Sequence, residues 1–360
     1  MKRLSYLPIR LFAALAVLSV GCLPSYDYTS PVTCTNPTVT TTQAGSTSGF
    51  ADGNLTTAQF NTPTAVGFDL SGNLIVIDQL NHRIRRISGA GTVSTLAGTG
   101  VAGFADGPGT TTAQFNNPSS FAVEISGNII VADKGNHRIR RITPSGIVST
   151  IAGSTQGFAD GNGTAAQFDG PTDVTIDAAG NLYVTDMNNH RIRRISTSGD
   201  VSTLAGSATP GNVDGTGAAA QFNQPAGIIR DITGTLYVVD RGNHRIRRVT
   251  QAGVVTTIVG STQGSADGAA LTAQFNSPFG ITLDGLGNLF ISDQGNHRIR
   301  KISTTGAVTT LAGSTSGLTE GTGTAAQFNQ PAALTVSADG SLLFVADQGN
   351  HRIRRLVCTQ

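Results

Sequence analysis

The 360-residue sequence contains no tryptophan and few charged residues, and both shortages narrow the range of functions. Only 13% of the residues are Asp, Glu, Lys or Arg, and 24 basic against 22 acidic side chains give a formal net charge of +2. Proteins that bind nucleic acid by neutralising phosphates carry a larger basic excess, so we expect no nucleic-acid partner. Without tryptophan, and with five tyrosines, the chain also has few rings on which sugars could stack, which makes a carbohydrate binder a weaker hypothesis.

Long apolar runs are also absent, since the longest one, Leu11 to Gly21, is too short to span a bilayer. A positively charged segment precedes this run and Cys22 follows it, which resembles a bacterial lipoprotein signal peptide. We therefore predict a signal peptide over residues 1–21, lipidation of Cys22, a tether over 22–36 and a folded domain over 37–360. The resulting protein would be exported and held in the cell envelope by its lipid. An ordinary secretory signal is the alternative, and it would give a secreted protein.

The rest of the chain is a repeat of one motif. The hexapeptide Asn-His-Arg-Ile-Arg-Arg, with Lys in the last place of one copy, occurs six times at spacings of 53 to 55 residues. Its histidines are His82, His137, His190, His244, His297 and His351. Each is followed by one of the arginines Arg83, Arg138, Arg191, Arg245, Arg298 and Arg352. Four residues before each histidine stands one of the aspartates Asp78, Asp133, Asp186, Asp240, Asp293 and Asp347. A period of this length indicates a propeller or an array.

Each copy has the pattern of four short strands. In the third copy they cover residues 173–178, 182–186, 190–196 and 200–205, which are rich in β-branched residues and are separated by turn-forming Gly, Asn and Ser. Four antiparallel strands form one blade of a β-propeller. The sequence therefore predicts an all-β fold, a six-bladed β-propeller with four-stranded antiparallel blades.

The two ends of the chain complement each other. The last copy stops after its third strand, and residues 39–44 resemble a fourth strand, so we predict that the N-terminal strand closes the last blade and leaves no open edge. This register brings Cys34 beside Cys358. We predict a disulfide between them, with two free thiols as the alternative, and a disulfide implies an oxidising compartment.

The strand that ends in Asp, followed shortly by Asn-His-Arg-Ile, resembles the NHL repeat over residues 37–360. The chain is thus similar to bacterial NHL-repeat propeller proteins, with arginine where the name-giving motif has leucine. That family includes kinase sensor domains, RNA-binding modules and metal-dependent lyases, so the resemblance implies the fold and leaves the function open.

The motif residues are better explained by structure than by chemistry. The histidines would stand about 10 Å or more apart around the ring, too far to ligate one metal, so we expect a structural role for them, no metal and no cofactor. The arginines are balanced by acids within each copy and are expected to form ion pairs. Arg230 differs, because the other copies have an apolar residue there; it is a candidate ligand contact near the channel, with a salt bridge as the alternative.

The connectors between copies and the corners that carry the histidines should share one face of the ring. We expect this loop-rich face to bind a partner. The first hypothesis is a lipid-anchored, non-enzymatic binding or scaffold module for another protein, touching the membrane only through its anchor. The alternative is a metal-dependent propeller enzyme, a lyase or lactonase-like hydrolase, with its site at the central channel. No residue is predicted to be catalytic, and the oligomeric state is left open.

Overall fold

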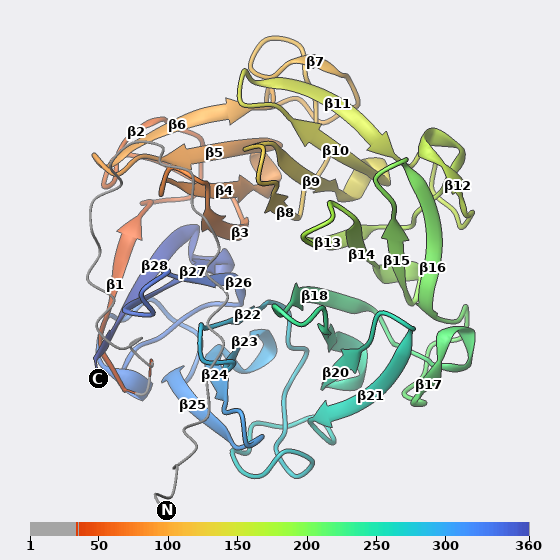
Figure 1. Cartoon of the computed structure of the whole chain (residues 1–360). Coiled ribbons are helices and arrows are strands. Elements are labelled where there is room, and N and C mark those ends of the chain that lie inside the picture. Colours follow the sequence, from red (N-terminus) through yellow and green to blue (C-terminus); the bar gives the residue numbers. More distant parts are fainter. Residues whose placement is uncertain (1–33, 35, 360) are drawn as a thin grey trace, which may run out of the picture. The chain divides into compact units, whose positions relative to one another are not determined.

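The structure, a computed structural model, describes residue 34 and residues 36–359, and it forms a ring of six β-sheets around a central axis (Figure 1). The predicted all-β, six-bladed propeller is confirmed. We number the blades along the chain, as β3–β6, β8–β11, β13–β16, β18–β21, β22–β25 and, for blade 6, β26–β28 with β1.

Every blade is built from the same four antiparallel strands. The innermost strands are β3 (Pro63–Phe68), β8 (Ser120–Val123), β13 (Pro171–Ile176), β18 (Pro225–Arg230), β22 (Ile281–Leu283) and β26 (Pro331–Val336). The second strands are β4 (Leu74–Asp78), β9 (Ile129–Asp133), β14 (Leu182–Asp186), β19 (Leu236–Asp240), β23 (Leu289–Asp293) and β27 (Leu342–Asp347). The third strands are β5 (Arg83–Ile87), β10 (Arg138–Ile142), β15 (Arg191–Ile195), β20 (Arg245–Val249), β24 (Arg298–Ile302) and β28 (Arg352–Thr359). The outer strands are β6 (Thr92–Ala97), β11 (Ile147–Ala152), β16 (Asp200–Gly206), β21 (Val254–Val259), β25 (Val308–Gly313) and β1 (Asn36–Ala44).

Four blades contain a fifth strand, which the sequence analysis did not predict. In each of them two residues of the connector pair with the outer strand; these pieces are β2 (Gly53–Asn54), β7 (Gly107–Pro108), β12 (Gly161–Asn162) and β17 (Gly215–Thr216). In blades 5 and 6 the equivalent contact is a single bridge, Gly268 with Val308 and Thr40 with Gly321. The connectors therefore cover the outer edges of the blades, which would otherwise present unpaired backbone groups.

Short 3-10 helices shape the loops. Six form the corners between second and third strands, η1 (Gln79–Asn81), η2 (Lys134–Asn136), η4 (Met187–Asn189), η6 (Arg241–Asn243), η7 (Gln294–Asn296) and η9 (Gln348–Asn350). Three more lie in connectors, η3 (Gly163–Ala165), η5 (Gly217–Ala219) and η8 (Gly323–Ala325). Within the described residues, no helix has the length and apolar character needed to cross a membrane.

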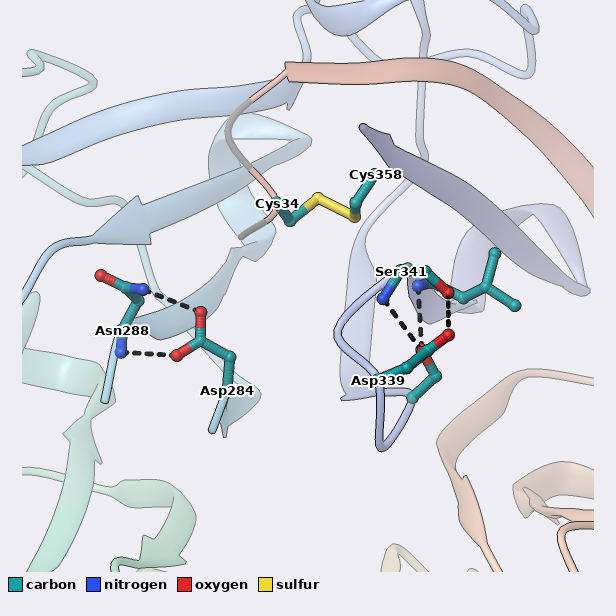
Figure 2. Close-up of a disulfide and its surroundings, with 8 residues drawn as sticks. Cys34, Asp284, Asn288, Asp339, Ser341 and Cys358 are labelled. Atoms are coloured by element: carbon teal, nitrogen blue, oxygen red, sulfur yellow. Dashed lines mark hydrogen bonds between the residues drawn. A yellow bond between two sulfur atoms is a disulfide. The ribbon is translucent and has the colours of Figure 1, made fainter. Parts of the chain in front are cut away.

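The ring is closed by the two ends of the chain, as predicted. β1 pairs antiparallel with β28 from Asn36 opposite Thr359 to Ala44 opposite Ile353. Figure 2 shows the disulfide between Cys34 and Cys358 beside this pairing, and it confirms the predicted bond. Because one partner strand comes from each end, closure of blade 6 joins residues that are more than 300 positions apart.

The core lies in the seams between blades. In the seam between blades 6 and 1, the connector residue Phe60 is fully buried among Val66 and Val76 of blade 1 and Phe344 and Ile353 of blade 6. Equivalent fully buried phenylalanines occupy the other five seams, at Phe115, Phe168, Phe222, Phe275 and Phe328. Burying a phenylalanine contributes about 1.5–3 kcal/mol, so the repeated Ala-Gln-Phe segment is a main source of contact between blades.

Antiparallel pairing places the loops at two opposite ends of the ring. The 3-10 corners lie against the connectors, since the amide of Leu80 donates to the carbonyl of Asn61. We call this end the connector face. The tight turns that join first to second and third to fourth strands, such as residues 69–73 and 88–91, lie at the other end, which we call the turn face.

Candidate functional site

Each motif histidine links its blade to the next one. His82 ends the 3-10 corner in the left-handed region, at φ 52°, and its Nδ1 accepts a hydrogen bond from the amide of Asn117 at 3.1 Å. The other five histidines accept in the same way, at 3.0–3.1 Å, from the amides of Gly170, Gln224, Ser277, Gln330 and Thr62. An accepting Nδ1 carries no proton, and burial lowers the pKa of each histidine, so the neutral form is favoured.

The second arginine of the motif forms a fully buried ion pair. In blade 2 the side chain of Arg140 has no solvent exposure and donates to Asp133 at 2.7 Å, to Asp106 of the connector at 2.6 Å and to two backbone carbonyls. Asp133 is equally buried, and this burial raises its pKa to about 6 even though Arg140 lowers it. Arg138, the first arginine of the motif, was singled out from the sequence, but the second one, Arg140, holds the blade together.

This arrangement recurs with one variation. The buried arginines are Arg85, Arg140, Arg193, Arg247, Arg300 and Arg354, and each pairs with the aspartate that ends the second strand of its own blade. In blades 1–5 a connector aspartate is the second partner. In blade 6 Glu320 replaces that aspartate and accepts instead from the amide of Thr42 in β1. The motif is thus used for folding in every blade.

The first arginine of the motif lies at the surface of the connector face. In blade 1 the guanidinium of Arg83 stacks on the ring of Phe50 at 3.7 Å from its centroid, and the equivalent pairs in blades 2 and 3 lie at 3.8 Å. The three rings, Phe50, Phe104 and Phe158, are each 43–45% exposed. Blades 4–6 have Asn212, Ser265 and Leu318 at this position. We call the three stacked pairs the aromatic arc; it makes one half of the connector face unlike the other.

The inner strands around the axis contain a second departure from the repeat, at Asp173. Its carboxylate accepts hydrogen bonds from the amide of Ile228 in blade 4, at 2.8 Å, and from Ser120 in blade 2, so it joins the innermost strands of three blades. Burial raises the pKa of Asp173 to about 6. The other blades have Ala, Ser or Gly at this position. Aligning the six copies would have singled out this acid from the sequence alone.

Two cations lie close to each other on the connector face. Lys134 begins the corner of blade 2 and Arg241 begins that of blade 4. Burial lowers the pKa of Lys134, and the neighbouring charge of Arg241 lowers it further.

The sequence-predicted sites are thus distributed over the ring. Among the described residues, no three His, Cys, Asp or Glu side chains come close enough to form a metal-binding group. Arg230 ends the innermost strand β18, and its side chain lines a cleft between blades 3 and 4 on the turn face. Cys22 lies outside the described residues.

Comparison with known proteins agrees with this architecture. Two segments, residues 115–142 and 168–195, match the NHL repeat model. It is 29% identical over 329 residues to NHL repeat-containing protein 2 from Homo sapiens, a match that covers 79% of this chain and 45% of that protein. The chain therefore spans less than half the length of this relative.

Solved structures share the fold. An auxiliary nutrient binding protein from Bacteroides thetaiotaomicron superimposes with a TM-score of 0.68 at 18% identity, covering 89% of this chain and 76% of the other. A streptogramin B lyase superimposes with a TM-score of 0.56 at 14% identity, covering 91% of this chain and 99% of the other. At these identities the likeness concerns the fold alone, and it includes both a binding protein and an enzyme.

Proposed function

We propose that this protein is a non-enzymatic binding or scaffold module that contacts another protein through the connector face of its propeller. The observation that carries the proposal is the aromatic arc. It places three exposed phenylalanines, each stacked on an arginine, on neighbouring blades of the loop-rich face. Aromatic residues and arginine are enriched at protein interfaces and supply most of their strongest contacts.

The rest of the motif supports a recognition role for the arc. The histidines and the second arginines are used in bonds within and between blades, so they hold the ring rather than a ligand. The stacking also keeps each phenylalanine in a fixed position before a partner arrives. A side chain that is ordered in advance loses less conformational entropy on binding, which favours affinity.

We further propose that the protein works outside the cytoplasm, in the cell envelope, held there by lipid on Cys22. The Cys34–Cys358 disulfide supports this location, because such bonds persist in oxidising compartments. The fold shared with an auxiliary nutrient binding protein is consistent with a binding role, but it does not indicate which ligand this chain binds.

The test replaces the arc by residues that the chain itself carries elsewhere. A triple variant, Phe50→Asn, Phe104→Ser and Phe158→Ser, copies the polar residues of blades 4 and 5. The control, Ile125→Ser with Ile232→Ser, removes two almost fully exposed apolar side chains from the turn face. After cross-linking in intact cells, we expect one defined complex with the wild type and the control and its loss with the triple variant. A complex that survives the triple change would refute the proposal.

A second candidate function is an enzyme with its site at the central channel. The specific observation in its favour is Asp173, a carboxyl group among three inner strands whose pKa of about 6 suits a general base. The metal-dependent form of this hypothesis fits poorly, because the described residues provide no set of three metal-binding side chains. Hydrolysis of a small lactone by the purified protein, lost in Asp173→Asn, would favour this candidate over the first.

A further inference from the structure

The turn face contains a cleft between blades 3 and 4 with a volume of about 760 Å³. One wall is a row of cross-strand neighbours in blade 3, Tyr183 on β14, Arg194 on β15 and Ser202 on β16. The other wall belongs to blade 4 and includes Arg230 and Gln251. The volume is within the range of about 300–1,000 Å³ that is usual for small-molecule sites.

Arg230 is what distinguishes this seam from the others. The corresponding residues of the other blades are all apolar: Phe68, Val123, Ile176, Leu283 and Val336. In the seam between blades 6 and 1, Phe68 fills the space and packs edge-on against Phe344, with ring centroids 5.6 Å apart. The aligned residue opposite Arg230 is Tyr183. The Nε–H of Arg230 is buried and donates to no partner among the described residues, and these residues give its guanidinium no ion pair either.

The side chains that line the cleft carry more positive than negative charge. The nearest acid, Asp177, is already occupied in its own turn: one oxygen accepts from the amides of Ala179 and Asn181, and the other from the side chains of Asn181 and Tyr183. Arg194 bonds the Asn181 side chain at 2.9 Å rather than an acid.

The arginines at the position of Arg194 in blades 1 and 2 do pair with an acid. In blade 2 the equivalent Arg141 pairs with the acid of its turn, Glu124, at 3.1 Å. In blade 1 Arg86 pairs with Asp69 at 3.6 Å. The cleft between blades 3 and 4 therefore combines two guanidinium groups with one carboxylate that is bonded elsewhere, a net excess of one positive charge among its lining side chains.

We propose that this cleft binds a small hydroxylated carboxylate, such as a sugar acid. A single carboxylate matches the excess charge, and it can accept paired hydrogen bonds from the planar guanidinium of Arg230. Ser202 and Gln251 line the rest of the cleft and can bond hydroxyl groups. This site lies on the turn face, so it is independent of the partner surface proposed for the connector face.

The test measures binding of D-glucuronate to the purified protein by calorimetry, with D-glucose and inorganic sulfate as comparison probes. Glucose has the hydroxyls without the carboxylate, and sulfate has the charge without the hydroxyls. The variant Arg230→Leu introduces the residue that blade 5 has at this position. The control Arg248→Leu removes the same charge from blade 4 at the position aligned with Arg194, where Leu283 stands opposite.

We expect the wild type and Arg248→Leu to bind glucuronate with similar affinity and to bind glucose and sulfate at least about 10-fold more weakly. Arg230→Leu should weaken glucuronate binding by about 10-fold or more, as expected when a charged hydrogen-bonding partner is lost. Its melting temperature should be no lower than that of the wild type, which shows that the ring is intact. Absence of saturable glucuronate binding, equal binding of sulfate or glucose, or unchanged binding in Arg230→Leu would each overturn the proposal.

Discussion

Replacing Arg140 by leucine is the most direct test of how the blades are held together. Arg140 and Asp133 have no solvent exposure and lie 2.7 Å apart, so the substitution leaves a buried carboxylate without its cation. Removing one partner of a buried pair costs about 3–5 kcal/mol. We therefore expect Arg140→Leu to lower the free energy of unfolding by that amount at pH 8.

The cost should depend on pH in a defined direction. The pKa of Asp133 is about 6 while Arg140 is present and lowers it, so it rises further when Arg140 is removed. The carboxyl of the variant then takes up a proton as the pH falls, and the neutral group is cheaper to bury. The loss of stability caused by Arg140→Leu should accordingly be smaller at pH 5.5 than at pH 8.

Urea unfolding followed by far-ultraviolet circular dichroism measures both effects. The matched control is Arg141→Leu, because the next residue is 40% exposed and its pair with Glu124 should contribute less than about 1 kcal/mol. The double variant Arg140→Leu with Asp133→Asn removes both charges and should be less destabilised than Arg140→Leu alone. A loss of stability below about 1 kcal/mol for Arg140→Leu would refute the reasoning. It would also be refuted if the loss in the double variant equalled the sum of the losses measured separately for Arg140→Leu and Asp133→Asn.

Three further predictions concern a histidine hydrogen bond, the disulfide and the lipid anchor. His82→Asn keeps the left-handed corner but removes the acceptor for the amide of Asn117, so thermal melting should show a loss of about 1 kcal/mol at pH 8. Because burial lowers the pKa of His82 below 6.5, the hydrogen bond stabilises the fold above pH 6.5 and is lost as the pH falls, so the loss caused by the substitution should be smaller at pH 5. Replacing Cys34 and Cys358 by serine opens a loop of 324 residues and should lower the free energy of unfolding by an amount near the top of the ~2–5 kcal/mol range that is usual for disulfides. Amide exchange in β1 should become faster, and unchanged exchange would contradict this prediction. Mass spectrometry of protein from membranes should find lipid on Cys22, and Cys22→Ala should release the protein from the membrane fraction; an unmodified, cleaved N-terminus would show an ordinary secretory signal instead.

The sequence alone predicted the features that recur with the repeat. The spacing of the motif predicted six blades, the missing last strand predicted closure by residues 39–44, and the same register predicted the bond between Cys34 and Cys358. These features follow from the strand order and the periodicity, which can be determined from the sequence without knowing how the sheets pack.

The importance of individual side chains was harder to predict. Alternation along β5 puts Arg85 and Ile84 on opposite faces, yet both are fully buried, because every blade is covered by a neighbour on each side. Alternation therefore could not show which arginine is buried. Asp173 acts through contacts with adjacent blades, and such contacts depend on how the sheets pack, which a single copy of the repeat does not encode. Arg230, in contrast, could be singled out from the sequence, because the other copies have an apolar residue there.

Closure of the ring by both ends of the chain has a consequence for how the protein is made. Residues 36–44 precede blades 1–5 in the chain and their partner β28 follows these blades, so β1 has no partner strand until five whole blades have been synthesised. During that time it is an unpaired strand, which is prone to associate with other chains. The sheet of blade 6 can form only after β28 has been synthesised, so the blade that contains the earliest of the ring's strands is the last one to be completed.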